Sequence, residues 1–140
     1  MKKTLDDKPS EVIDEYYIWA ERQKDDYPQP TERNGKWLIF VDKNNIDEVW
    51  AKIKKTTEEG LLGGSAKVAT AKPNSLAHDP DKRVICVYTY DWTDKEDTMR
   101  VRSELRKIGI TQKISYKSDE DTSKGKYNAR GYKNISKYYE

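Results

Sequence analysis

The sequence predicts an α+β fold in which a mostly antiparallel sheet carries helices on one face. Short runs rich in β-forming residues alternate with segments whose apolar residues recur at helical spacing. The expected order is helix, strand, helix, two strands, helix, strand, a long loop and a terminal strand. With 140 residues, 34% of them hydrophobic, the chain can build one thin core, and its four Trp and ten Tyr supply much of the buried area.

Residues 1–30 are predicted to form an N-terminal helix and a linker ahead of an α+β core domain at residues 31–140. Ser10 can cap a helix whose apolar residues recur at helical spacing to about Gln23. Two prolines in the stretch that follows predict an extended linker. The first thirty residues hold five Lys/Arg and eight Asp/Glu, so an acidic leader precedes a body with twenty-two Lys/Arg and seventeen Asp/Glu.

The core domain is predicted to contain two helices and five strands, the last strand following a long C-terminal loop. Asparagine, threonine and aspartate favour helix starts, whereas glycine favours helix ends. The helices are therefore expected between Asn44 or Asn45 and Gly60, and between Thr93 or Asp94 and Gly109. The strands are expected at residues 36–41, 66–72, 83–90, 112–117 and 135–139.

Several classes of function lack the residues that they need. The chain has no G-x-x-x-x-G-K-[ST] loop for phosphates and no G-x-G-x-x-G turn after a strand. One Cys and one His cannot build a zinc site from nitrogen and sulfur ligands, so neither a metal nor a cofactor is predicted. No run of eighteen apolar residues or signal-peptide core occurs, and Cys86 lies inside the apolar run VICVY. We therefore expect a cytoplasmic protein without a membrane span, with Cys86 buried.

Basic residues on the predicted strands are the strongest pointers to a ligand. These residues are Lys36 at the start of the first core strand, Lys67 and Lys72 on the second, and Arg83 at the start of the third. A lysine inside a strand is disfavoured unless its face is solvated or holds an anion. Lys67 therefore predicts either a solvated sheet face or an anion site.

Tryptophans on the core elements are candidates either for packing or for stacking on a ligand. Trp50 fits the apolar stripe of its helix. Trp92 lies in the polar stretch YTYDWTD and is the best candidate for an exposed stacking residue, with Trp37 as the other. On the helix after Trp92, Arg102 and Arg106 share a face that we expect to be solvated.

From Gly35 onward the chain resembles the C-terminal two-thirds of the eukaryotic cap-binding translation initiation factor. The matching patterns are GKWLI at residues 35–39, a helix with Trp50, the strands AKVATAK and VICVYT, R-V-x-x-x-L-x-x-x-G from Arg100 to Gly109, and YKS ending at Ser118. The resemblance implies a curved, mostly antiparallel sheet backed by helices, with its concave face open.

The same resemblance implies a ligand site. In the cap-binding factor two tryptophans sandwich a methylated base, an acidic residue reads the edge of the base, and basic strand residues bind the phosphates. Lys67 and Lys72 fall near those phosphate positions. Trp19 and Tyr27 are the candidates for the ring that the N-terminal half of the factor supplies.

The chain is also similar to an uncharacterised family with this fold, whose members are sometimes labelled phosphothreonine lyase-domain proteins. In effector phosphothreonine lyases a strand lysine abstracts the Cα proton and a histidine protonates the leaving oxygen. The resemblance implies Lys67 as the base, but Leu38 stands where the lyase has its histidine. Loss of a general acid costs about 10²–10⁴ in rate, and only His78, in a polar loop, could replace it.

The leading hypothesis from the sequence is non-catalytic binding of a phosphorylated ligand, namely a nucleotide, an RNA end or a small nucleotide signal, on a basic concave sheet face. Lys36, Lys67, Lys72 and Arg83 would engage phosphates, and Trp37 or Trp92 would stack on a base. A phosphothreonine-lyase-like enzyme with Lys67 as base is the first alternative. A protein-interaction module that uses the aromatic tail is the second.

Overall fold

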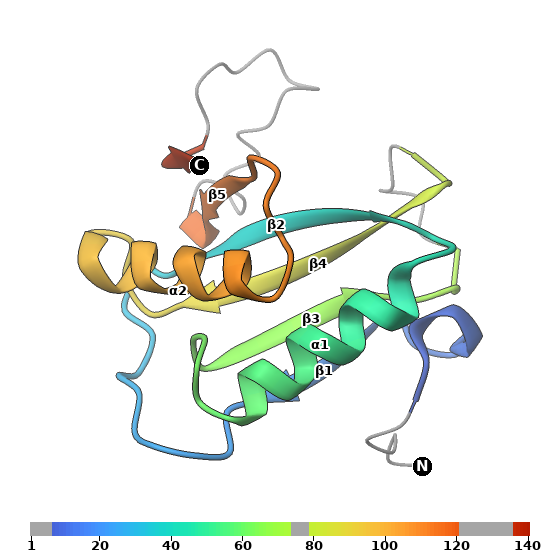
Figure 1. Ribbon diagram of the computed structural model, residues 1–140, viewed down its shortest axis with the longest axis horizontal. Coiled ribbons are helices and arrows are strands. Elements are labelled where there is room, and N and C mark those ends of the chain that lie inside the picture. Colours follow the sequence, from blue (N-terminus) through green and yellow to red (C-terminus); the bar gives the residue numbers. More distant parts are fainter. Residues whose placement is uncertain (1–6, 74–78, 121–135) are drawn as a thin grey trace.

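The computed structural model describes residues 7–73, 79–120 and 136–140. They form a six-stranded antiparallel sheet in the order β1-β3-β4-β2-β5-β6, with both helices on the same side (Figure 1). The strands are β1 (Tyr17–Glu21), β2 (Gly35–Asp42), β3 (Ser65–Ala69), β4 (Lys82–Thr89), β5 (Ser115–Ser118) and β6 (Tyr138–Tyr139). The two α-helices are α1 (Ile46–Glu58) and α2 (Lys95–Lys107), and a 3-10 turn, η1 (Pro9–Glu11), precedes β1. The predicted α+β fold is confirmed.

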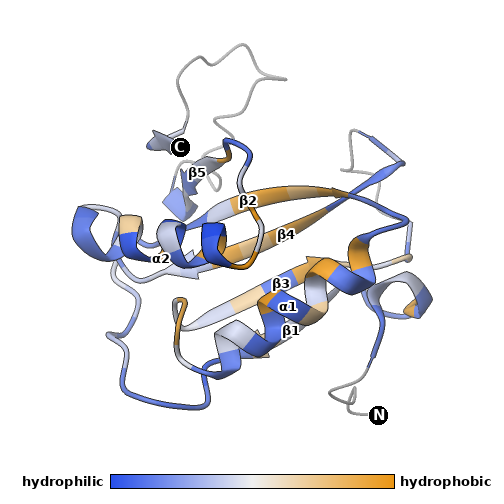
Figure 2. Cartoon of the chain, viewed as in Figure 1, coloured by the Kyte–Doolittle hydropathy of each residue, from blue (hydrophilic) through white to orange (hydrophobic). Residues whose placement is uncertain are grey.

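Alternation along the two central strands builds the core. Trp37 and Ile39 on β2, and Ile85 and Val87 on β4, are fully buried on the side that faces the helices. Figure 2 shows these hydrophobic stretches of β2 and β4 at the centre of the sheet. The helices contribute the buried side chains Trp50, Ile53, Val101 and Leu105. The other face of the sheet carries no helix in the described part of the chain, and we call it the open face.

The predicted signals act at the start of α2 and at the end of α1, whereas Asn45 precedes α1 without a side-chain capping hydrogen bond. A side-chain oxygen of Asp94 accepts a hydrogen bond from the backbone N–H of Asp97 at 3.1 Å, so Asp94 caps α2. After α1, Gly60 adopts a φ of 78°, a left-handed conformation that suits glycine best. A Cβ at Gly60 would also lie 2.6 Å from the carbonyl oxygen of Lys24. Both helices therefore begin and end within one or two residues of their expected limits.

The predicted N-terminal helix is wrong. Only η1 is helical there, and Tyr17–Glu21 form an edge strand in register with β3. Ile18 and Ala20 are buried whereas Trp19 and Glu21 are exposed, which is the period of a strand. Over so few residues the same aromatic and β-branched side chains also match helical spacing, and pairing with β3 decides the outcome. Part of the acidic leader thus belongs to the sheet.

Arg102 is buried and not solvated, contrary to the expectation for its helix face. Its side chain is 0% exposed. The guanidinium donates to the backbone carbonyls of Ile110, Gln112 and Glu140 at 2.9, 2.7 and 3.1 Å. Burial lowers the pKa of Arg102 from its ordinary value. This residue therefore ties α2 to the segment that precedes β5 and to the residue that follows β6. Arg106, one turn later, is exposed as expected.

No helix of the described residues has the length and the apolar character that a bilayer crossing requires.

Gly63, in the connection from α1 to β3, lies against the backbone of Tyr88 on β4. A Cβ at Gly63 would lie 1.8 Å from the carbonyl oxygen of Tyr88, whereas a Cβ at Gly64 would make only an ordinary 3.5 Å contact with the Tyr27 ring. Gly63→Ala should therefore lower the free energy of unfolding by about 1–3 kcal/mol or more. Gly64→Ala is the matched control and should change it much less. Urea midpoints measure both, and equal midpoints would contradict the backbone contact.

Candidate ligand-binding site on the open sheet face

One row of paired residues crosses the whole open face. The pairing registers link one residue from each strand, and these are Trp19, Lys67, Cys86, Leu38, Ser115 and Tyr139 in spatial order. Trp19 and Tyr139 are exposed at the two ends. Burial raises the pKa of the Cys86 thiol to about 11, although Lys67 and Lys36 act in the opposite direction. The thiol is therefore un-ionised at neutral pH.

Lys67 is held among three aromatic rings. Its Nζ lies 4.1 Å from the ring centroid of Tyr17, 5.3 Å from that of Trp19 and 6.0 Å from that of Tyr88. Trp19 and Tyr88 also stack on each other, with centroids 5.7 Å apart and planes at 20°. No carboxylate pairs with Lys67 within the described residues. The rings therefore fix the position of a cation whose charge is not neutralised by a neighbouring acid.

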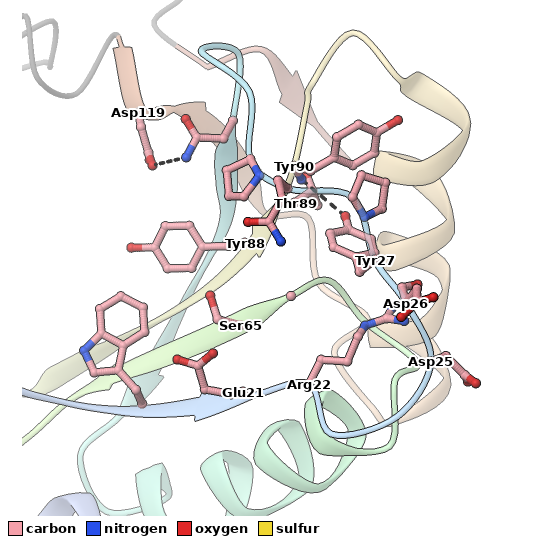
Figure 3. A pocket seen from close by; sticks show the side chains of 16 residues that line it. Glu21, Arg22, Asp25, Asp26, Tyr27, Ser65, Tyr88, Thr89, Tyr90 and Asp119 are labelled. Carbon is pink, nitrogen blue, oxygen red and sulfur yellow. Dashed lines mark hydrogen bonds between the residues drawn. The ribbon is translucent and has the colours of Figure 1, made fainter.

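A cavity of about 530 Å³ opens beside Lys67. It lies between the segment that joins β1 to β2 and the adjoining ends of β3 and β4, and Figure 3 shows its lining. Four aromatic rings line it, those of Trp19, Tyr27, Tyr88 and Tyr90. Four carboxylates also line it, those of Glu21, Asp25, Asp26 and Asp119, whereas Arg22 is the one cation among the described residues of the lining. The cavity is thus aromatic and acidic, while Lys67 lies just outside it.

Two of these carboxylates differ in their availability to a ligand. Asp119 accepts hydrogen bonds from Lys36 Nζ at 2.7 Å and from Asn34 Nδ2 at 3.0 Å. Glu21 is exposed and has no ion-pair partner among the described residues. In Figure 3 the Glu21 carboxylate extends from β1 toward Ser65. Glu21 is therefore more available than Asp119 to accept hydrogen bonds from a bound molecule.

Tyr27 forms the wall of the cavity opposite the sheet. Its hydroxyl donates to Asp97 at 2.6 Å and accepts from the backbone N–H of Tyr90 at 3.3 Å. Burial and the Asp97 carboxylate raise the pKa of Tyr27 well above its usual value. The Arg22 guanidinium lies over the Tyr27 ring, 4.7 Å from its centroid, and donates to the Leu62 carbonyl at 2.8 Å. These contacts fix the ring against the body of the domain.

Asp91 anchors the segment that joins β1 to β2. Its carboxylate accepts hydrogen bonds from Thr31, from the Arg33 guanidinium and from both the backbone and the hydroxyl of Thr93. Burial alone would raise the pKa of Asp91, but these hydrogen bonds outweigh it and lower the pKa to about 2. The backbone N–H of Thr31 also donates to the Tyr90 carbonyl at 3.0 Å. The cavity wall is thus tied to the end of β4.

Lys36 and Lys117 lie side by side across β2 and β5 on the open face. Lys36 is buried and ion-paired with Asp119. Burial, together with the Lys36 ammonium, lowers the pKa of Lys117 from its ordinary value. An anion bound near this pair would reduce the repulsion between the two ammonium groups.

The structure brings together only two of the residues predicted to bind a ligand, Lys36 and Lys67. Trp37 is 0% exposed and its ring N–H donates to the Thr98 carbonyl at 3.2 Å, so the predicted stacking role does not fit it. Trp92 is half-buried against the core, with Lys137 Nζ 4.5 Å from its ring centroid. Neither ring lines the cavity.

Lys72 and Arg83 lie away from the cavity. Lys72 follows the end of β3, and its Nζ is 4.3 Å from the ring centroid of Tyr16. Arg83 pairs with Val41, so it points to the helix side of the sheet, and it donates to the Pro80 and Lys82 carbonyls. Neither position supports the predicted phosphate contacts beside Lys67. His78 and most of the aromatic tail lie outside the described residues.

Residues 30–123, more than half of the chain, match the family model described as basophilic leukemia-expressed protein Bles03. The chain belongs to the Bles03 family. Among solved structures it is similar to C. elegans eIF4E-3 in complex with the 4E-binding protein Mextli, with a TM-score of 0.52 and 19% identity over 66% of this chain and 56% of that one. A complex of the same two proteins with a cap analog matches with a TM-score of 0.48 and 22% identity, over 66% of this chain and 54% of that one.

The match with a TM-score of 0.52 confirms the predicted cap-binding-factor-like fold for this Bles03-family chain. The chain spans a little over half the length of the eIF4E-3 chains that it matches. Neither the family description nor the structural matches name a lyase activity.

Sequence reasoning missed most of the cavity of this Bles03-family domain. Trp19 and Tyr27, the ring candidates implied by the resemblance, both line it. Tyr88 could have been placed by alternation, since it is two residues from Cys86 and therefore on the same face. Neither Glu21 nor Asp119 could be placed at a cavity from the sequence, because Glu21 lay in the predicted N-terminal helix and Asp119 in the predicted C-terminal loop.

The carboxylate of Asp91 makes the domain sensitive to acid. A carboxyl whose pKa is lowered from 3.8 to about 2 on folding contributes stability above its unfolded pKa, and that stability is lost as the pH falls through this range. Urea midpoints should therefore fall more steeply between pH 4 and pH 2 in the wild type than in Asp91→Asn. Asp26→Asn, which removes an exposed carboxylate, controls for net charge. Parallel pH profiles of wild type and Asp91→Asn would contradict the anchoring role.

Proposed function

We propose that this domain binds a phosphorylated, nucleotide-like ligand on its open face without converting it. The observation that carries the proposal is Lys67, whose ammonium is held among three rings beside an aromatic cavity and has no carboxylate partner among the described residues. A cation fixed in this way, on a face without a helix, is suited to an anionic group of a ligand.

The distribution of charge in the site determines how such a ligand would lie. The carboxylates around the cavity repel a phosphate, so the phosphate takes the side of Lys67, whereas Lys36 is already ion-paired with Asp119. The cavity itself offers aromatic rings for stacking and the Glu21 carboxylate as an acceptor for N–H groups. A base that presents ring or amino N–H groups meets both requirements. The ligand is therefore expected to place its base in the cavity and its phosphate over Lys67.

Nucleotide titration tests this arrangement. Isothermal titration calorimetry with a nucleoside and its mono-, di- and triphosphates should show affinity that increases with the number of phosphates. Lys67→Ala should weaken binding of the triphosphate by about tenfold or more, since a charge-assisted contact contributes about 1.5–3 kcal/mol. Lys52→Ala, on the exposed face of α1, is the matched control and should bind as the wild type does. Unchanged affinity in a folded Lys67→Ala protein would overturn the assignment.

A phosphothreonine peptide separates binding from the lyase alternative. The row that contains Lys67 continues with Cys86 and Leu38, and Leu38 can neither donate nor accept a proton. We therefore expect mass spectrometry to show the peptide unchanged after incubation with the protein. Loss of phosphoric acid from the peptide, abolished by Lys67→Ala, would instead establish the lyase.

A further inference from the structure

The open face continues beyond Lys67 as an apolar surface. Tyr17 pairs with Ala69 across β1 and β3, and Phe40 pairs with Val84 across β2 and β4. The register of β3 with β4 brings Ala69 beside Val84, so these four residues and Leu38 form one surface, which we call the apolar patch. Phe40 is 60% exposed, an unusual state for a phenylalanine within a strand.

Lys67 lies between the cavity and the apolar patch. On β3 the open-face residues follow in the order Ser65, Lys67 and Ala69, of which Ser65 lines the cavity and Ala69 lies in the apolar patch. On β4 the order is Tyr88, Cys86 and Val84 at the same three levels. Residues on one face of a strand repeat every ~7 Å, so the cavity and the apolar patch are separated by about 13 Å. The backbone of Lys67 thus lies midway between two surfaces that can each stack on a ring, and its ammonium lies 4.1 Å from the ring centroid of Tyr17 in the apolar patch and 5.3 and 6.0 Å from those of Trp19 and Tyr88 in the cavity.

This order matches the chemistry of a nucleic acid strand, in which a phosphodiester joins two nucleosides. Exposed aromatic side chains on a sheet stack on unpaired bases, and lysines between them contact the phosphates. A mononucleotide held in the cavity would reach Lys67 but would leave Phe40 in water. We infer that the ligand is a single-stranded nucleic acid, whose chain runs from the cavity over Lys67 and places a second base on Phe40. The inference rests on the proposed function and extends it.

Charge favours this occupant over an apolar protein segment. A protein helix laid across the apolar patch would remove water from Lys67 without supplying an anion, which is unfavourable. A polyanion gains from Lys67 and from the basic balance of residues 31–140, with twenty-two Lys/Arg and seventeen Asp/Glu.

Phe40 allows the second base position to be tested separately from the first. Fluorescence anisotropy with a short labelled single-stranded RNA should show tighter binding than calorimetry gives for the mononucleotide. Phe40→Ala should weaken RNA binding by about tenfold, because base–aromatic stacking contributes about 1–3 kcal/mol, and should leave mononucleotide affinity unchanged. Ile13→Ala is the matched control, since Ile13 is 73% exposed and lies outside the sheet. Thermal melts confirm that both variants fold.

Salt dependence tests the phosphate contact in the same assay. Lys67→Ala should reduce the slope of log affinity against log salt by about 0.7, the amount expected for one phosphate of a single strand. DNA of the same sequence serves as the second arm, and weaker binding of DNA would assign a contact to the 2′-hydroxyl.

The outcomes distinguish the two proposals. If the mononucleotide binds through Lys67 but RNA binds no more tightly and Phe40→Ala has no effect, the inference fails while the proposed function stands. If RNA binds and neither Phe40→Ala nor Lys67→Ala weakens it, the strand takes another path and the inference also fails. If neither ligand binds, both proposals fall.

Discussion

The pairing of β3 between β1 and β4 is the constraint on which the site depends. Ala66 and Val68 are fully buried under the helices, and side chains alternate strictly along a strand, so Lys67 must point to the open face. A slip of one residue would exchange the two faces and bury the ammonium in an apolar core. The core therefore fixes the register, and the register sets Lys67 opposite Trp19 and Cys86. The position of the cation is a consequence of folding and needs no ligand to establish it.

A second set of contacts gives the cavity its shape before any ligand arrives. Asp91 and Tyr27 tie the segment between β1 and β2 to β4 and to α2 through side chains that lie far apart in the sequence. Ordering this segment costs conformational entropy, and the cost falls on folding and not on binding. The same contacts explain why the segment, with its two prolines, need not be a free linker. The outward-facing residues of this segment remain at the rim of the cavity. Loops held in this way commonly carry the residues that determine which ligand binds.

The elements that follow from local pattern could be predicted from the sequence, whereas those that depend on distant partners could not. The apolar runs around Ile39 and Ile85, and the helix stripe with Trp50, match their strands and helix because burial on one face leaves a regular period. β1 has too few residues for the period of a strand to be distinguished from that of a helix, so its pairing with β3 could not be predicted. The cavity could not be predicted either, because the contact between Tyr27 and Tyr90 depends on how the chain returns to β4. Trp37 was misplaced because tryptophan is equally suited to a core and to a stacking surface.

Separation of charge across the open face bears on selectivity. Carboxylates surround the cavity, while Lys67, Lys36 and Lys117 lie on the strands beside it. A free phosphate would meet only the cationic side and gain nothing from the rings. A neutral aromatic molecule would fill the cavity and leave Lys67 without an anionic partner. Only a ligand with a ring bearing N–H groups at one end and an anion at the other satisfies both sides at once, and reversing it would bring like charges together. Under the proposed function, the arrangement would therefore select orientation as well as composition, because the sheet holds its charges at fixed positions.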